Sequence, residues 1–259
     1  MAKAWAKFPY PDKKYQHTAA TLKKAWDRLH KGDAEPFPKN EALVDAWIAF
    51  HAGDFQKAAE LGLKAGAEGT SVANKAQAIY ANYLEEGEKR KLELFQEVAG
   101  RAEAQQAKEP KNANAFYWQA YALGRYAQGI SVVKALTQGI GGQVKAALEA
   151  TIKLAPRHAD AHIALGSYHA EVIDKVGAMI GGLTYGAKKD LALKNFQAAL
   201  KLAPESAIAR IEYANGLALL EGKKSLKEAE KLYAEAAACE PLDAMERLDV
   251  ELARSELED

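Results

Sequence analysis

The sequence has almost no cysteine and no long apolar segment. Cys239 is the only cysteine among the 259 residues, which excludes an internal disulfide and a cysteine-based metal cluster. No stretch approaches the roughly 18 uncharged apolar residues of a membrane span, and the residues after Met1 lack the apolar core of a signal peptide. We therefore expect a cytoplasmic protein without a membrane span.

The sequence also lacks an excess of charge of either sign. It contains 35 Lys and Arg residues and 35 Asp and Glu residues. No overall field therefore attracts polyanions or an anionic membrane surface, and we expect no nucleic-acid partner. The first 40 residues are basic and the last 20 are acidic. Selection of charged ends for solubility explains this distribution.

Four prolines mark corners at which one helical segment ends and another begins. Pro110, Pro156, Pro204 and Pro241 are separated by 46, 48 and 37 residues, and each is followed by apolar residues at helical spacing. These separations are close to the length of a helical-hairpin repeat with insertions. The pattern predicts an all-α fold, an α-α superhelix of antiparallel helix pairs with lengthened middle helices.

We predict two parts in the chain. Residues 1–40 form an N-terminal arm and a capping helix, because Phe8-Pro9-Tyr10-Pro11 disfavours a helix and apolar residues at helical spacing follow from about residue 18. Residues 41–259 form the helical-repeat domain. Its last segment, residues 244–257, has one apolar and one acidic side and is expected to cap the open end of the solenoid.

The residues before two of the corners resemble the tetratricopeptide repeat, in which small residues let two helices approach and a proline ends the second helix. Small, large and small residues stand at the required offsets before Pro204 (Ala192, Phe196, Ala199) and before Pro241 (Ala229, Tyr233, Ala236). The Leu-Gly position of the preceding helix is filled by Leu165-Gly166. The resemblance covers roughly residues 41–241.

Two units depart from that repeat by about a dozen extra residues, and both insertions contain Ile-Gly-Gly, at residues 140–142 and 180–182. With Ala170-Glu171-Val172-Ile173-Asp174-Lys175 and the segments 182–187 and 193–200, residues 113–241 resemble the repeat domain of the regulator of microtubule dynamics family. Some eukaryotic members are associated with organelle contacts and lipid handling. This alanine-rich sequence looks bacterial and lacks their anchor, so the resemblance implies only a groove for an apolar ligand or a peptide.

Candidate catalytic and metal-binding residues are few. One polar cluster has histidines four and seven residues apart, so that pairs share a helix face: His158, Asp160, His162, His169, Glu171 and Asp174. No His-Glu-x-x-His motif is present, and packing is the favoured role. The Gly-Gly pairs follow no strand and complete no nucleotide motif, so turns are expected there. We predict no catalytic residue, no metal and no cofactor, hence not an enzyme.

Two binding functions remain. In the first, a non-enzymatic interaction or scaffold protein binds a protein or peptide segment in the concave groove of the superhelix, through Tyr117, Tyr121, Arg125, Ile163, Ser167, Ile211 and Asn215. In the alternative, the protein carries or senses a lipid-like apolar ligand between the lengthened helices, through Val172, Val176, Met179, Ile180 and Leu183. An open groove would favour the first function and a closed pocket the second.

Overall fold

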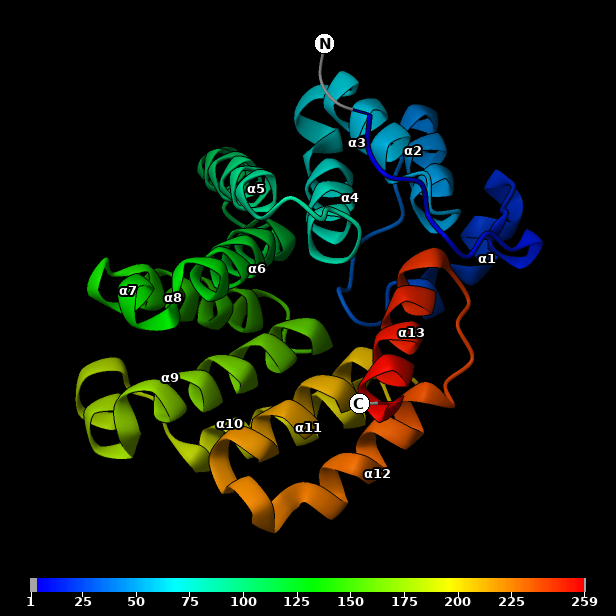
Figure 1. Cartoon of the computed structure of the whole chain (residues 1–259). Coiled ribbons are helices and arrows are strands. Elements are labelled where there is room, and N and C mark those ends of the chain that lie inside the picture. Colours follow the sequence, from blue (N-terminus) through cyan, green and yellow to red (C-terminus); the bar gives the residue numbers. More distant parts are fainter. Residues whose placement is uncertain (1–3, 259) are drawn as a thin grey trace.

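A computed structural model describes residues 4–258, and the regular structure in this part of the chain is helical (Figure 1). Antiparallel pairs follow one another along the chain, and each packs on the next. They are α2 (Glu41–His51) with α3 (Phe55–Lys64), α4 (Thr70–Tyr83) with α5 (Glu88–Lys108), α6 (Ala113–Ile130) with α8 (Ile140–Leu154), α9 (Ala159–Tyr185) with α10 (Lys189–Leu202), and α11 (Ala207–Glu221) with α12 (Leu226–Ala237). The predicted all-α superhelix is confirmed.

Helices α1 (Ala19–Leu29), α7 (Val132–Thr137) and α13 (Ala244–Glu258) lie outside these pairs. Short 3-10 turns occupy Lys13–Tyr15, Gly66–Gly69 and Gly222–Ser225. None of the helices in residues 4–258 is long and apolar enough to cross a membrane.

The proline corners share one local structure. Proline cannot continue a helix because it lacks the N–H group and its ring clashes with the preceding turn. Two residues after each proline, a polar side chain accepts a backbone N–H at the start of the next helix. These caps are Asn112 for α6, His158 for α9, Ser206 for α11 and Asp243 for α13.

Small residues allow α9, α10 and α11 to approach closely around Phe196. The ring is fully buried and stacks on Tyr213, with 5.2 Å between ring centroids. A Cβ atom added at Gly166 would lie 2.8 Å from the ring, and one added at Gly216 would lie 2.4 Å from it. The Leu-Gly position found in the sequence is therefore a point of contact between neighbouring helices.

The insertions in the middle units differ from the prediction. α6 ends at Ile130, and Ser131, with φ of 91°, leads into the separate helix α7. α9 is long, as predicted, but its helix is broken at Gly177, where φ is 80°. The prediction of turns at the Ile-Gly-Gly sequences was wrong, because both lie in helices and the backbone leaves the helical conformation at Gly139 and Gly177 instead.

The N-terminal arm lies along α3 and α4. The ring of Trp5 stacks on Tyr80 at 4.2 Å between centroids, and the backbone N–H of Trp5 donates to Oε1 of Gln56 at 2.9 Å. Phe8 is buried against Phe55, and its ring leaves no room for a side chain at Gly53. The arm therefore extends the hydrophobic core at the start of the superhelix.

The helix α13 does more than cap the last pair, because it also reaches back to the first helices of the chain (Figure 1). Glu246 forms an ion pair with Arg28 of α1 at 2.6 Å, and buried Asp243 bonds to Nδ1 of His51 in α2 at 2.7 Å. Asp249 accepts a hydrogen bond from the hydroxyl of Tyr83 at the end of α4. These contacts join the two ends of the superhelix.

Candidate functional site

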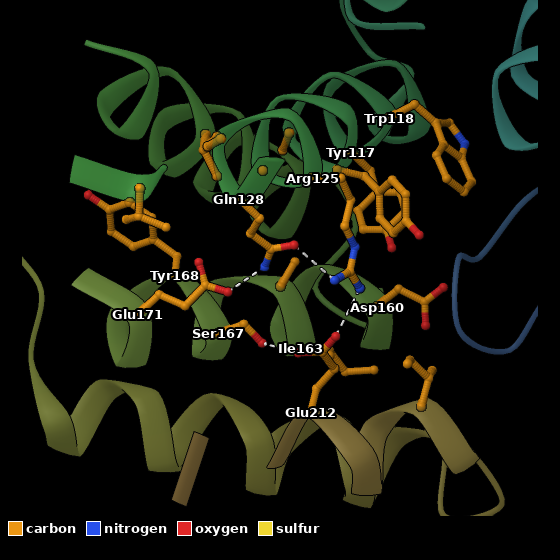
Figure 2. A pocket seen from close by; sticks show the side chains of 18 of the residues that line it. Tyr117, Trp118, Arg125, Gln128, Asp160, Ile163, Ser167, Tyr168, Glu171 and Glu212 are labelled. Carbon is orange, nitrogen blue, oxygen red and sulfur yellow. Dashed lines mark hydrogen bonds and ion pairs between the residues drawn. The ribbon is translucent and has the colours of Figure 1, made fainter. Parts of the chain in front are cut away.

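A cavity of about 130 Å³ lies at the centre of the molecule, between α6 and α9 (Figure 2). Residues of α4, α7, α8, α11 and α13 complete its walls. The space in front of the cavity opens to solvent. Helices from four consecutive pairs, together with α13, therefore converge on one site.

The wall formed by α7, α8 and the middle of α9 is apolar. Its residues are Val132, Ala135, Leu136, Val144, Tyr168 and Val172. Gly141 allows α8 to come close here, since a Cβ at this position would lie 2.5 Å from a methyl group of Leu136. An apolar ligand bound against this wall would remove apolar surface from contact with water, which favours binding.

A belt of polar side chains crosses the middle of the cavity (Figure 2). Arg125 of α6 forms an ion pair with Glu212 of α11 at 2.9 Å, and the hydroxyl of Ser167 of α9 donates to the second oxygen of Glu212 at 2.9 Å. Gln128 accepts from Arg125 at 3.1 Å and donates to Glu171. The belt thus joins α6, α9 and α11 through one ion pair and three hydrogen bonds.

Burial shapes the electrostatics of this belt. Burial lowers the pKa of Arg125, whereas the neighbouring Tyr121 and Glu212 raise it, and the net result is a pKa well above the ordinary value. Burial also raises the pKa of Glu171. Arg125 therefore remains a cation beside apolar surface, which favours contact with an anionic or strongly polar group.

The opposite wall contains tyrosines and carboxyl groups. Tyr117 and Tyr121 of α6 face Asp160 of α9 and Asp249 of α13. Burial, followed by the charge of Asp33, raises the pKa of Asp160 to about 7, and burial raises the pKa of Asp249 well above its usual range. This wall is therefore less negative near neutral pH than its composition suggests.

The structure brings five of the seven predicted groove residues together in this cavity: Tyr117, Tyr121, Arg125, Ile163 and Ser167. The other two lie elsewhere on α11. Ile211 is buried with Val250 and Ala253 of α13, and Asn215 accepts a hydrogen bond from Tyr233. The lining residues from α7 and α13, and Glu212, were not predicted, since nothing in the local sequence shows which distant helices meet α6.

The residues predicted to line an apolar pocket are mostly outside the cavity. Only Val172 lines it, and Val176 is partly buried in the core nearby. Met179, Ile180 and Leu183 are 75%, 50% and 86% exposed. The break at Gly177 turns the end of α9 away from its first part, which is why the regular helical spacing did not place these residues correctly.

The predicted polar cluster on α9 does not converge. Nδ1 of His158 accepts the N–H of Ala161, and Nδ1 of His162 bonds to Asn195 at 2.8 Å. His169 is buried beside Tyr168, and burial lowers its pKa to about 4. Within residues 4–258 no three His, Cys, Asp or Glu side chains are placed to hold a metal ion.

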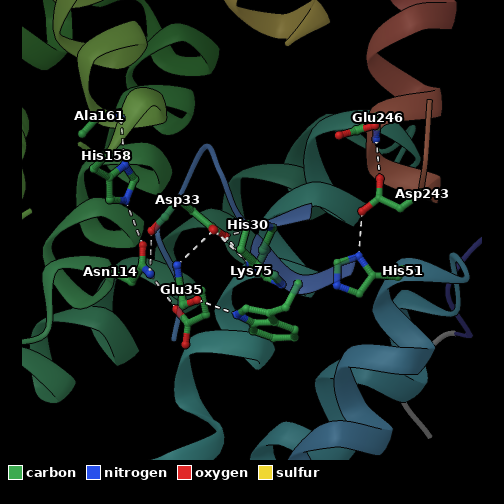
Figure 3. Close-up of polar contacts among 11 residues, drawn as sticks. His30, Asp33, Glu35, His51, Lys75, Asn114, His158, Ala161, Asp243 and Glu246 are labelled. Atoms are coloured by element: carbon green, nitrogen blue, oxygen red, sulfur yellow. Dashed lines mark hydrogen bonds and ion pairs between the residues drawn. The ribbon is translucent and has the colours of Figure 1, made fainter. Parts of the chain in front are cut away.

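Residues 30–35 fill the part of the concave surface next to the cavity (Figure 3). Asp33 accepts from Lys75 of α4 at 2.6 Å and bonds to His30 at 2.9 Å, and all three side chains are buried. Burial raises the pKa of Asp33, but the neighbouring His30 and Lys75 lower it more, to well below its ordinary value. The backbone carbonyl of Gly32 accepts the N–H of Asp160 at 3.0 Å.

Asn114 extends this network to α6 and α9 (Figure 3). Its amide donates to the backbone oxygen of Asp33 at 3.0 Å and to Glu35 at 2.6 Å, and its oxygen bonds to Nε2 of His158 at 2.9 Å. Because Nδ1 of His158 accepts a backbone N–H, the proton must sit on Nε2, which donates to Asn114. A neutral histidine therefore completes the network, consistent with a pKa lowered by burial to about 4.

Together these features define a class: an all-α superhelix that fills part of its concave side with its own segments and keeps one central cavity. The family model described as regulator of microtubule dynamics protein 1-3 matches residues 55–254. The chain belongs to this family, as the resemblance in the sequence predicted. A search of curated proteins gave no match.

Proposed function

We propose that the protein is a non-enzymatic binding protein that carries or senses a small apolar ligand in the central cavity. The supporting observation is the apolar wall formed by α7, α8 and α9, which lines a preformed space. Ligand sites are usually concave, mostly apolar and equipped with a few convergent polar groups. The cavity has this composition.

The size of the cavity limits the part of a ligand that it can enclose. Its volume of about 130 Å³ is close to the roughly 150 Å³ of an apolar cavity that takes up benzene. A longer ligand would place one apolar end against Leu136 and Val172 and extend to the polar belt. Its polar end would then meet Arg125, the cation of the belt.

Binding of a protein or peptide segment in the concave groove is our second candidate. Tyr121 and Arg125 line the cavity and are partly exposed, so they could anchor such a segment. However, residues 30–35 and α13 already cover much of the concave side. A peptide would find less free surface there than in an open solenoid, and for this reason we favour the small ligand.

Native mass spectrometry followed by organic extraction tests the first proposal. Purified protein should release an apolar molecule or take up decanoate as a probe. Ala164→Phe places a ring in the cavity and should reduce both, whereas Ala146→Phe adds the same ring to the exposed face of α8 and should change neither. Wild-type protein that is empty and takes up no probe would contradict the proposal, as would equal loading of the two variants.

The second candidate makes a different prediction. Replacing Tyr121 with Ala should weaken capture of a partner segment without lowering the melting temperature if the ring serves binding. A matched loss of capture and of melting temperature would show that the ring only packs against Arg125, whose guanidinium lies 5.4 Å from the ring centroid.

A further inference from the structure

The exposed apolar side chains gather at one edge of the superhelix, which we name the turn edge. It consists of residues 131–139, 174–190 and 219–228, where α6, α9 and α11 end and their partner helices begin (Figure 1). An ion pair of 2.9 Å between Lys189 and Glu221 joins two of these segments, and α7 packs on α9. Six of the ten large apolar side chains exposed among the described residues lie here: Val133, Met179, Ile180, Leu183, Leu219 and Leu226.

The local backbone turns the most prominent of these side chains outward. Gly177 interrupts α9, and the helix resumes at Ala178 and ends at Tyr185, just before Gly186, whose φ is 66°. In residues 178–185, Gly181 lies on the side of the helix that faces the protein, where an added Cβ would be 3.5 Å from a methyl group of Val172. The small residue faces the protein and Met179 and Leu183 face solvent, which reverses the usual arrangement of a surface helix.

The turn edge is also basic. Seven lysines and four acidic residues lie in its segments, which gives a net charge of +3 in a chain whose total is zero. Lys175 and Lys189 are paired with Asp174 and Glu221. The other five lysines have no acidic partner within 4.0 Å in the described part of the chain: Lys134, Lys188, Lys223, Lys224 and Lys227.

We propose that the turn edge docks on the surface of an anionic phospholipid membrane. Apolar side chains that protrude between lysines match the interface of such a membrane, because they enter the boundary of the acyl chains while the lysines meet lipid phosphates and carboxylates. The contact is peripheral, since no helix of the described residues could span the bilayer. It does not depend on a ligand in the central cavity.

The charges argue against a second copy of the chain as the occupant. A symmetric contact would bring the lysines of two turn edges together. The acidic helix α13 of another copy is a poor substitute, because three of its five acidic side chains, Glu246, Asp249 and Glu251, are already bound to Arg28, Tyr83 and Arg247 of their own chain. An anionic lipid surface has no such competing contacts.

Vesicle flotation tests the proposal. The full chain should float with vesicles of equal parts phosphatidylcholine and phosphatidylserine and much less with pure phosphatidylcholine vesicles, and added salt should weaken the binding. Met179→Ser with Leu183→Ser should lower the apparent affinity about tenfold or more. The matched control is Leu63→Ser with Leu154→Ser, which removes two leucines of 48% and 40% exposure outside the turn edge and should leave binding unchanged.

A charge variant gives an independent readout. Lys188→Gln with Lys223→Gln should lower the affinity for the anionic vesicles about tenfold and flatten its salt dependence, whereas Lys153→Gln with Lys201→Gln, on helices α8 and α10 outside the turn edge, should not. Circular dichroism verifies that each variant is folded. The proposal is overturned if folded wild-type protein ignores the anionic vesicles, or if the serine variant binds like its control. Concentration-dependent self-association that Leu183→Ser abolishes, without vesicle binding, would assign the edge to a second copy instead.

Discussion

Two glycines in helices should respond in opposite ways to replacement by alanine. Gly216 lies in α11 and is buried against the ring of Phe196, whereas Gly100 lies in α5 with nothing within 4 Å of the position that a Cβ would occupy. Alanine is favoured over glycine inside a helix by about 0.8–1.0 kcal/mol. Helix propensity alone therefore predicts that both substitutions stabilise the protein by similar amounts.

Packing reverses the sign at Gly216. The new Cβ would lie 2.4 Å from Cε2 of Phe196, and the ring cannot retreat because Gly166 of α9 already touches its other side. Overpacking of this kind costs about 1–3 kcal/mol. We expect Gly216→Ala to lower the free energy of unfolding by on the order of 1 kcal/mol after the propensity gain. Gly100→Ala should raise it by roughly 0.5–1 kcal/mol.

Urea unfolding followed by circular dichroism measures both effects, provided that the m-values of the variants agree. The double variant Gly216→Ala with Phe196→Leu separates the clash from other causes. Because leucine is smaller than phenylalanine, Gly216→Ala should cost less unfolding free energy in the Phe196→Leu background. The difference, a coupling energy, should be at least about 0.5 kcal/mol. The reasoning is refuted if Gly216→Ala is as stable as wild-type protein, or if the two substitutions in this pair are strictly additive.

Two further predictions concern the buried network around residues 30–35. Lys75→Met leaves the buried charge of Asp33 without its partner at 2.6 Å and should cost about 3–5 kcal/mol of unfolding free energy, whereas Lys89→Met, at a lysine whose side chain is 93% exposed, should cost almost nothing in the same urea titration. Burial, followed by the charge of Asp33, raises the pKa of Glu35 from 4.5 to about 8, so the folded state holds an extra proton and this contribution to stability is lost as the pH rises from about 4.5 to 8. Partial exposure limits this loss to on the order of 1 kcal/mol. Below pH 6.5 the loss is opposed by His30, whose pKa burial lowers from 6.5 to about 4, so the fall in stability should be clearest above pH 6.5. Thermal melts across this range should show a flatter profile for Glu35→Gln, and an unchanged slope would contradict the assignment.

Local sequence signals were sufficient for the helical pairs and for part of the site. The proline corners fixed four helix boundaries because each combines a residue that ends a helix with a cap for the next one. Tyr117, Tyr121 and Arg125 recur four residues apart, so they share one face of α6, and the structure places all three in the cavity. These features depend on neighbours within one helix or one corner.

The rest of the site depends on contacts between distant segments. Glu212 completes the polar belt from α11, 87 residues after Arg125. The helical periodicity after Val172 also predicted one continuous apolar face, but a single glycine at position 177 changes the direction of the chain. Neither the meeting of α6 with α11 nor the positive φ of one glycine among 19 leaves a local pattern in the sequence.

The ends of the superhelix carry the largest difference between expectation and structure, and this difference bears on function. In an open solenoid each unit contacts only its neighbours, and a groove along the concave side stays free for a partner. Here Asp243 bonds to His51 across 192 positions of sequence, and Glu246 bonds to Arg28 across 218. The sequence of α13 predicts an acidic, solvated cap. These contacts instead hold α13 on the concave side, where Met245 and Asp249 line the cavity. The contacts that close the superhelix also cover part of the groove and leave a smaller cavity that opens to solvent on one side. This is the structural basis for favouring a small ligand over a peptide.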